Sequence, residues 1–290
     1  MSKAHRGSIF LEDAQVLEHR AFEADQYILR LQAPKCAARA EPGSFAHLQC
    51  DPMLPMRRPL SIMRSSPEGG WLEFLYKAVG QGTALLARRQ PGERLSLLGP
   101  IGNGFSPNPE RRRPLLIGGG VGIPPMVFLA DRLRRDPELS PFVIMGSEVP
   151  FPFKARPSTM LVPGIPEGVI ATMPLLEDWH VPGRLCSLRG YPGCHEGYVT
   201  DLARLWLDAQ PTTQRTQIQI FACGPHPMLE AVARLAADYE LPCQVSLEEF
   251  MACAVGGCAG CVVEVKTDQG PAMKRVCVDG PVFAAESVFD

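Results

Sequence analysis

The pattern of hydrophobic and polar positions changes near residue 110. Before that point, short apolar runs alternate with polar positions and are separated by Pro and Gly, as at 27–31, 71–76 and 94–98. Short strands bounded by turn residues are typical of an antiparallel barrel or sandwich. We therefore predict an N-terminal antiparallel β-barrel domain over residues 1–108.

After that point, strand-like and helix-like runs alternate. The pattern predicts strands at 115–117, 142–145 and 217–222, and helices at 126–133, 201–207 and 228–239, with Thr200 as the cap of the 201–207 helix. Such alternation indicates a parallel sheet covered by helices, so residues 109–242 are predicted to form a central α/β nucleotide-binding domain. The last residues, 243–290, are predicted to form a small third domain.

Two glycine-containing turns follow predicted strands of this sheet. The first, Gly118–Gly122, leads into a helix with two early prolines, and the second covers Cys223–Met228. Glycines let the backbone approach a pyrophosphate, and a helix start offers unpaired N–H groups. The first turn alone fits a tight turn into a buried helix equally well, because Pro125 replaces the last glycine of G-x-G-x-x-G. Two such turns on one sheet indicate a nucleotide site.

Composition and charge narrow the class of protein. With 46% hydrophobic residues, 21% charged residues and a net charge of −2, the 290-residue chain has material for two or more packed cores and no cationic excess for nucleic acid or lipid. Residues 1–8 lack the apolar stretch of a secretory signal, and the longest uncharged run, 114–130, is too short to span a bilayer. We predict a cytoplasmic protein whose cysteines stay reduced.

Four of the ten cysteines lie within the last 38 residues. Their spacing, C-x4-C-x2-C-x15-C at Cys253, Cys258, Cys261 and Cys277, is that of plant-type ferredoxins, in which four thiolates hold a [2Fe–2S] cluster. The residues between the first three cysteines are small or apolar and allow close backbone approach. Zinc is the main rival, although structural zinc sites usually have two paired knuckles. Four buried structural thiols are the remaining alternative.

Several motifs together resemble a known family. In chain order they are R-P-x-S at 58–61, G-T at 82–83, L-G-P-x-G-N-G-F at 98–105, G-G-G-V-G-I-x-P at 118–125, C-G-P-x-x-M at 223–228 and the four cysteines. The chain resembles the iron–sulfur electron-transfer subunit of the two-subunit, NAD-linked dihydroorotate dehydrogenase, a branch of the ferredoxin–NADP reductase superfamily. The likeness runs from about residue 43 to the end and is most specific at 246–263 and 274–283.

The resemblance implies FAD in the barrel, NAD(H) as substrate of the α/β domain and a plant-type-like [2Fe–2S] domain at the C-terminus. It places Arg58 at the FAD pyrophosphate, Ser61 near the isoalloxazine edge and Cys223 near the face of hydride transfer. The implied FAD residues are Arg58, Pro59, Leu60, Ser61, Leu75, Tyr76, Lys77, Gly82 and Thr83. The implied nicotinamide-nucleotide residues are Gly118, Gly119, Gly120, Val121, Gly122, Cys223, Gly224, Pro225 and Met228. It requires no general acid or base, and none is named.

Two departures from the family pattern stand out. Phe250 occupies a position that is usually arginine, next to the cluster loop. Residues 150–192 form a long, proline-rich stretch in which Ser187–Gly190 replaces an acidic, glycine-containing turn, and its role as a lid, a partner surface or a long loop is open. In this region Glu148 suits a ribose 2′-hydroxyl and hence NADH, whereas Arg189 suits a 2′-phosphate and hence NADPH. The balance favours NADH.

The predicted function is a relay from NADH through FAD and the cluster to a partner, with the cofactors supplying the redox chemistry. The resemblance implies that this partner is a catalytic flavin (FMN) dehydrogenase subunit in a hetero-oligomer of pyrimidine biosynthesis. One alternative is a reductase subunit of a different oxidoreductase complex. Another is a zinc-bound, non-catalytic scaffold, which visible absorption distinguishes from a flavin and iron–sulfur protein.

Overall fold

The computed structural model describes residues 8–289, and residues 1–7, within the start that is predicted to lack a secretory signal, lie outside them. The chain divides into two compact units, Met1–Gly104 with Leu247–Val282, and Phe105–Ser246 with Phe283–Asp290. The predicted division into three domains, with boundaries after residues 108 and 242, stays a prediction. Within residues 8–289, no helix is long and apolar enough to cross a membrane.

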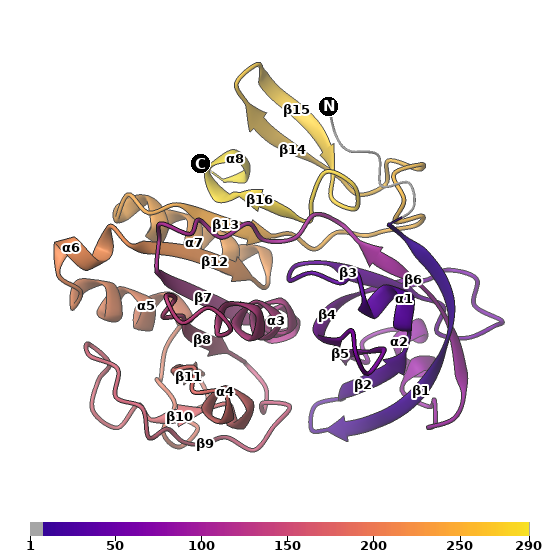
Figure 1. The fold of residues 1–290 in the computed structure, drawn as a ribbon, viewed down its shortest axis with the longest axis horizontal. Helices are drawn as coiled ribbons and strands as arrows, with labels where there is room; N and C mark the ends of the chain where they lie inside the picture. The colour runs from indigo at the N-terminus through magenta and orange to yellow at the C-terminus, as the bar shows by residue number, and fades with distance from the viewer. Residues whose placement is uncertain (1–7, 290) are drawn as a thin grey trace. The chain divides into compact units, whose positions relative to one another are not determined.

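The first unit contains a closed antiparallel barrel with the strand order β1-β2-β5-β4-β3-β6 (Figure 1). Its strands are β1 (Phe10–Phe22), β2 (Gln26–Gln32), β3 (Phe45–Leu48), β4 (Arg58–Ser66), β5 (Trp71–Lys77) and β6 (Arg94–Ile101). The predicted runs at 27–31, 71–76 and 94–98 lie in β2, β5 and β6, so the predicted barrel is confirmed. Leu29, Leu31, Phe74 and Leu97 are fully buried, as expected for a barrel core filled by side chains.

Two short helices and a two-stranded hairpin also belong to the first unit. Two short helices, α1 (Pro34–Ala37) and α2 (Gln81–Leu86), connect barrel strands. The C-terminal part of the unit adds an antiparallel hairpin of β14 (Val262–Thr267) and β15 (Gly270–Arg275) after the loop that carries three of the four clustered cysteines. Gly270 has a φ of +102°, which the tight hairpin turn requires and which side chains with a Cβ rarely adopt.

The second unit is built on a six-stranded sheet with the order β11-β8-β7-β12-β13-β16 (Figure 1). Its strands are β7 (Arg113–Gly119), β8 (Phe142–Gly146), β11 (Gly183–Cys186), β12 (Ile218–Cys223), β13 (Cys243–Ser246) and β16 (Val282–Ala284). The pairs from β11 to β13 are all parallel, which confirms the predicted α/β sheet. Strands β7 and β12 are almost continuously apolar and buried, as parallel strands covered on both faces must be.

The chain turns in opposite directions from the two central strands. From β7 it passes through α3 (Ile123–Leu133) to β8, and from β12 through α7 (His226–Asp238) to β13 on the other side. The unit also contains α4 (Pro174–Asp178), α5 (Val199–Asp208), α6 (Thr212–Arg215) and α8 (Ala285–Val288), with a 3₁₀ turn at Gly120–Gly122. The reversal makes the gap between β7 and β12 a topological switch point, where ligands bind in open α/β sheets.

Two details differ from the sequence prediction. Helix α5 begins at Val199, not after Thr200, because the Asp201 carboxylate accepts the Tyr198 N–H at 2.9 Å and so caps the helix two residues earlier than expected. Strands β11 and β13 were not predicted, since each is only four residues long.

The proline-rich stretch 150–192 is ordered around short elements: β9 (Arg156–Pro157), β10 (Ala171–Thr172), α4 (Pro174–Asp178) and β11. The Glu177 carboxylate accepts hydrogen bonds from the Ser158 hydroxyl and from the Thr159 N–H and hydroxyl, all within 2.8 Å. Buried Arg184 donates to the Met160 carbonyl at 2.7 Å. These long-range polar contacts fix the stretch to the edge of the sheet.

Candidate functional site

The four C-terminal cysteines interact as two pairs. The Cys258 N–H donates to Cys253 Sγ at 3.4 Å, and the two side chains are also hydrogen-bonded. A second side-chain hydrogen bond joins Cys261 and Cys277. Between residues 8 and 289, no group of three or more His, Cys, Asp and Glu side chains is arranged to hold one metal ion. Four cysteines that interact with one another in this way could hold an iron–sulfur cluster or another thiolate-bound metal.

The cluster loop, residues 253–261, directs backbone N–H groups at sulfur. Burial raises the pKa of Cys253, but N–H donors from Val255, Cys258 and Gly257 outweigh it and lower the pKa to about 7. The Gly260 N–H donates to Cys258 Sγ at 3.4 Å. Thiolates, not thiols, bind metal, and donors that favour the thiolate therefore suit an iron–sulfur cluster.

The loop reaches this shape through left-handed residues. Gly256 has a φ of +80°, and Ala254 and Ala259 adopt φ values of +57° and +51°.

Burial, together with the hydrogen bond and the charge of the neighbouring Cys261, raises the pKa of Cys277 to about 12. The thiol of Cys277 therefore stays protonated until a metal displaces its proton.

Three residues hold this segment in place; they lie in the motifs at 98–105 and 274–283, and the sequence analysis assigned them no role. Arg275 donates from its main chain and from Nε to the Asp279 carboxylate, at 2.8 and 3.2 Å, and from its terminal nitrogen to the Gly256 carbonyl. Asn103 donates to the carbonyls of residues 278 and 279, both at 3.1 Å. Asn103 belongs to the L-G-P-x-G-N-G-F motif, so the motif was visible in the sequence although its contact was not.

The predicted FAD residues Arg58 and Gly82 come together beside the barrel. A Cβ built on Gly82 would lie 2.8 Å from Arg58 Nε, so the guanidinium rests against the bare glycine backbone at the start of α2. The Arg58 terminal nitrogen also donates to the main-chain oxygens of Met56 and Arg57. An arginine fork held beside a glycine at a helix start is suited to a phosphate.

The other predicted FAD residues take different positions. Pro59, Leu60 and Ser61 are half-buried on β4, and Leu75 and Lys77 lie on its neighbour β5. The Tyr76 ring is buried, stacks on Tyr27 and bonds to His19 at 2.9 Å, and burial raises its pKa. The Thr83 hydroxyl accepts the N–H groups of residues 79 and 80. Tyr76 and Thr83 are therefore occupied by contacts within the protein.

The two predicted nucleotide turns pack directly against each other. Gly118 and Cys223 are paired residues of β7 and β12. A Cβ on Gly122 would lie 2.2 Å from the Cys223 carbonyl oxygen, and one on Gly119 would lie 2.4 Å from Met228 Sδ. The glycines therefore allow this close approach at the switch point between the two strands.

The top of the first turn is open. Gly120 has a φ of +54°, and a Cβ built on it meets no atom within 4 Å; the Val121 side chain next to it is 40% exposed. Of the second turn, Gly224 is buried, Pro225 is exposed and Met228 is half-buried. Helix α3 begins directly after the first turn, with its prolines in the first helical positions, where a missing N–H donor costs nothing. The turn thus presents backbone to solvent at the start of a helix.

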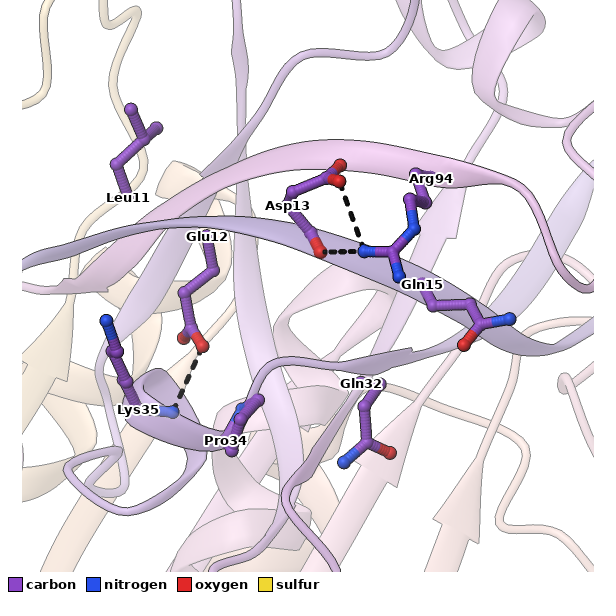
Figure 2. A pocket seen from close by; sticks show the side chains of 8 residues that line it. All are labelled: Leu11, Glu12, Asp13, Gln15, Gln32, Pro34, Lys35 and Arg94. Carbon is purple, nitrogen blue, oxygen red and sulfur yellow. Dashed lines mark hydrogen bonds and ion pairs between the residues drawn. The ribbon is translucent and has the colours of Figure 1, made fainter.

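A hollow of about 370 Å³ lies elsewhere on the first unit, where β1, β6 and α1 meet (Figure 2). In Figure 2 the Glu12 carboxylate points to the N–H of Lys35, at 3.1 Å, and Arg94 points to Asp13, at 3.1 Å. Its lining residues are Leu11, Glu12, Asp13, Gln15, Gln32, Pro34, Lys35 and Arg94. None of them belongs to a predicted site, and three of the four charged side chains bind within the protein.

The chain is similar to known proteins both in its C-terminal cysteine segment and over nearly its whole length. Residues 248–289 match the model of the iron–sulfur cluster binding domain of dihydroorotate dehydrogenase B. The electron transfer subunit of dihydroorotate dehydrogenase B (NAD(+)) from Geobacillus sp. (strain WCH70) is 34% identical over 286 residues, covering 96% of this chain and 98% of that protein. The homolog from Aquifex aeolicus (strain VF5) is 34% identical over 279 residues, with the same coverages.

Solved structures show the same fold. The NADH-dependent reduced ferredoxin-NADP oxidoreductase has a TM-score of 0.77 at 23% identity, covering 96% of this chain and 90% of that chain. Phthalate dioxygenase reductase has a TM-score of 0.58 at 14% identity and covers 99% of this chain and 98% of that chain. At these identities the likeness concerns the fold alone.

Proposed function

Because the chain belongs to the family of dihydroorotate dehydrogenase B electron-transfer subunits, within the ferredoxin–NADP reductase superfamily, we propose that it binds FAD and a [2Fe–2S] cluster and passes electrons between a nicotinamide nucleotide and a separate catalytic flavin subunit. The dihydroorotate chemistry belongs to that subunit, which we take to carry FMN and to form a hetero-oligomer with this chain. Two relatives with this name are 34% and 32% identical to the chain, and the similarity covers 98% and 97% of their length.

The observation that carries the proposal is the pairing of the four cysteines. Cys253 with Cys258, and Cys261 with Cys277, would supply two thiolates to each of two irons. The N–H groups aimed at Cys253 favour its thiolate form before metal binds. A [2Fe–2S] centre held by these residues would supply one-electron transfer, and FAD would supply the exchange between single electrons and the hydride of a nicotinamide nucleotide.

The other predicted site residues bind and orient FAD and the nicotinamide nucleotide. Arg58 and the bare backbone at Gly82 hold the FAD pyrophosphate, and the half-buried residues 59–61 of β4 line the flavin. The turns Gly118–Gly122 and Cys223–Met228 hold the dinucleotide at the switch point, with the open backbone at Gly120 facing its pyrophosphate. Buried Tyr76 contributes its main chain, because its hydroxyl is bonded to His19.

Analysis of the purified chain tests this proposal. We expect two irons, two sulfides and one FAD per chain, visible absorption of both groups, and reduction of an artificial dye by a nicotinamide nucleotide. Cys277→Ser removes one thiolate and is expected to lower the iron content strongly. Cys194→Ser, at a half-buried cysteine far from the loop in sequence, is the control and leaves iron unchanged. A colourless protein that contains zinc contradicts the proposal and supports the scaffold alternative.

One observation favours a second candidate, a reductase subunit for a different oxidoreductase. Phe250, at a position that is usually arginine in the family, has a relative exposure of 93% and lies three residues before the first cysteine ligand. An exposed aromatic ring beside an electron exit suits a partner surface that differs from the family's. Identification of the catalytic chain that co-purifies with the native protein decides between the two, and a partner that does not oxidise dihydroorotate favours the second.

A further inference from the structure

Two side chains outside the sequence motifs connect the segments that carry the predicted FAD residues. These segments are the end of β5 with Tyr76, helix α2 with Gly82, and the start of β4 with Arg58. The connecting residues are His19 on β1 and Arg89, three residues after the end of α2. Both are half-buried and belong to the first unit. We call His19 and Arg89 with their hydrogen-bond partners the His19–Arg89 network.

His19 bonds to two of these segments at once. Its Nε2 lies 2.9 Å from the Tyr76 hydroxyl, and its Nδ1 lies 2.8 Å from the Arg89 carbonyl oxygen. Because a carbonyl only accepts, we assign the Nδ1 proton to that contact, so that Nε2 of the neutral ring accepts the Tyr76 O–H. The contacts join positions 57 and 70 apart along the chain. One imidazole therefore fixes the end of α2 relative to β5.

Aromatic stacking keeps the His19 ring in the orientation that these bonds need. The ring centroids of His19 and Tyr27 lie 5.4 Å apart, as do those of Tyr27 and Tyr76, and His19 stacks on Tyr76 at 6.0 Å. The three rings come from the adjacent strands β1, β2 and β5. Tyr76 is 1% exposed, and a buried hydroxyl without a partner is costly. The Tyr76 ring therefore depends on the imidazole to keep its place.

Arg89 extends the connection to the segment that precedes Arg58. Its Nε donates to the Cys50 carbonyl at 3.1 Å, and one terminal nitrogen pairs with the Asp51 carboxylate at 2.8 Å. The other terminal nitrogen pairs with Glu93 at 3.3 Å. The Arg89 side chain is only 15% exposed, and charge-assisted contacts of this kind are the strong ones. From Asp51 the chain reaches Arg58 and β4 within seven residues.

Helix α2 is thus held at both ends. At its start, the Thr83 hydroxyl accepts the N–H groups of residues 79 and 80, and the Gly82 backbone rests against a guanidinium. After its end, His19 holds the carbonyl of Arg89. The helix has only six residues, and a helix of this length is not stable by itself. Contacts with other segments therefore determine where the helix lies.

We propose that His19 and Arg89 are positioning residues of the flavin site, which act without touching the flavin. They hold the segments of Tyr76, Gly82 and Arg58 at the separation that one FAD molecule requires. A ligand bound by several segments is sensitive to displacements near 1 Å in any of them, so the residues that support those segments contribute to affinity. This inference rests on the proposed function, because FAD is the ligand whose site the network supports.

The release of FAD from the purified full chain, followed by flavin fluorescence, tests this role. His19→Phe keeps a ring in the stack and removes both hydrogen bonds, and we expect it to release FAD about tenfold faster, the effect of two neutral hydrogen bonds. His19→Gln keeps a donor and an acceptor and is expected to recover most of the wild-type rate. Tyr27→Phe keeps the stack and both bonds of His19, and is the matched control.

Dye reduction separates positioning of the flavin from a general loss of structure. For His19→Phe we expect a lower kcat that excess free FAD restores, an unchanged KM for the nicotinamide nucleotide and an unchanged iron content. A general loss of structure would instead raise this KM and lower the iron content, and that outcome would count against the positioning role.

A double-mutant cycle tests whether the two residues act as one network. Arg89→Met breaks the contact with Asp51 but keeps the carbonyl that His19 binds, and is also expected to release FAD about tenfold faster. If the network acts as a unit, release from the double variant is accelerated by clearly less than about hundredfold. Arg94→Met, which removes the ion pair with Asp13 on the same barrel, is the control and is expected to behave as the wild type. Asp51→Asn, with an expected effect of about threefold, replaces Arg89→Met if that variant does not fold.

The outcomes separate this inference from the proposed function. Wild-type release rates in His19→Phe and in Arg89→Met overturn the inference while a flavin-containing chain leaves the proposed function intact. Effects that multiply in the double variant assign the two residues to separate causes and overturn the network. A wild-type chain that binds no FAD contradicts the proposed function and this inference together.

Discussion

Two glycine-rich loops in this chain need glycine for different physical reasons. In the nucleotide turn, Gly119 and Gly122 have ordinary backbone conformations, but a Cβ on either would collide with the neighbouring turn. In the cluster loop, Gly256 adopts a φ of +80° and the loop bends back so that N–H groups point at sulfur. Close packing requires glycine in the nucleotide turn, and backbone conformation is the main reason for glycine in the cluster loop. A glycine in the sequence therefore does not by itself tell whether close packing or backbone conformation requires it.

Gly122→Ala gives the strongest test of the packing explanation. The new Cβ would lie 2.2 Å from the carbonyl oxygen and 2.5 Å from the next amide nitrogen of the facing turn, and both are backbone atoms that cannot rotate away. We expect the two turns to separate and the affinity for the nicotinamide nucleotide to fall about hundredfold, since displacements near 1 Å at a binding site have effects of this size. Nucleotide titration measures the change, with FAD and iron content unaltered. Wild-type affinity in this variant would show that the turns are not rigidly packed.

Gly256→Ala tests the conformational explanation. The substitution places a side chain at positive φ, which costs roughly 1–2 kcal/mol, and brings the Cβ to 2.6 Å from Val278 Cγ2 and 3.2 Å from an Arg275 nitrogen. We expect the cluster to be lost about tenfold faster on incubation with an iron chelator, followed by the decay of visible absorption. Gly257→Ala is the matched control, because a Cβ there meets no atom within 4 Å and the N–H donor is kept. Equal decay rates for the two variants would contradict the conformational explanation.

Gly82 is a third case, and Gly82→Ala is expected to have the smallest effect of the three substitutions. Here the obstacle is a flexible side chain, because the new Cβ would lie 2.8 Å from Arg58 Nε. Arg58 can rotate away, so the barrel is expected to fold normally while FAD binds about three- to tenfold more weakly through a displaced charge-assisted contact. Flavin release monitored by fluorescence measures this change. Gly80→Ala, where a Cβ meets nothing within 4 Å, is expected to bind FAD as the wild type does.

The cysteine spacing and the glycine turns were readable from the sequence because they are local. Ligands three to five positions apart must lie on one loop, and a glycine turn between an apolar run and a helix must lie at a strand end. The barrel and the parallel sheet followed from the hydrophobic periodicity in the same way. Strands of four residues, such as β11 and β13, cannot be predicted in this way because they are too short to show a period.

Contacts between distant segments were not readable. The hydrogen bonds of Asn103 to the carbonyls of residues 278 and 279 join positions about 175 apart, and nothing in either segment specifies the other. The hydrogen bond of Arg189 to the main-chain oxygen of Glu148 is of the same kind, since β8 and β11 become neighbours only in the folded sheet.

The sequence by itself supplied the candidate chemistry: four cysteines with a ferredoxin-like spacing, an arginine motif and a Gly-Thr motif, and two glycine-containing turns at predicted strand ends. Local spacing and periodicity suffice for this, because they act between residues that are close along the chain. Only the tertiary structure decided that the cysteines interact as two pairs, that one nucleotide turn packs into the other, and that Arg189 lies at the end of β8. Those arrangements depend on strand order and on side-chain packing across the chain, which no local pattern encodes.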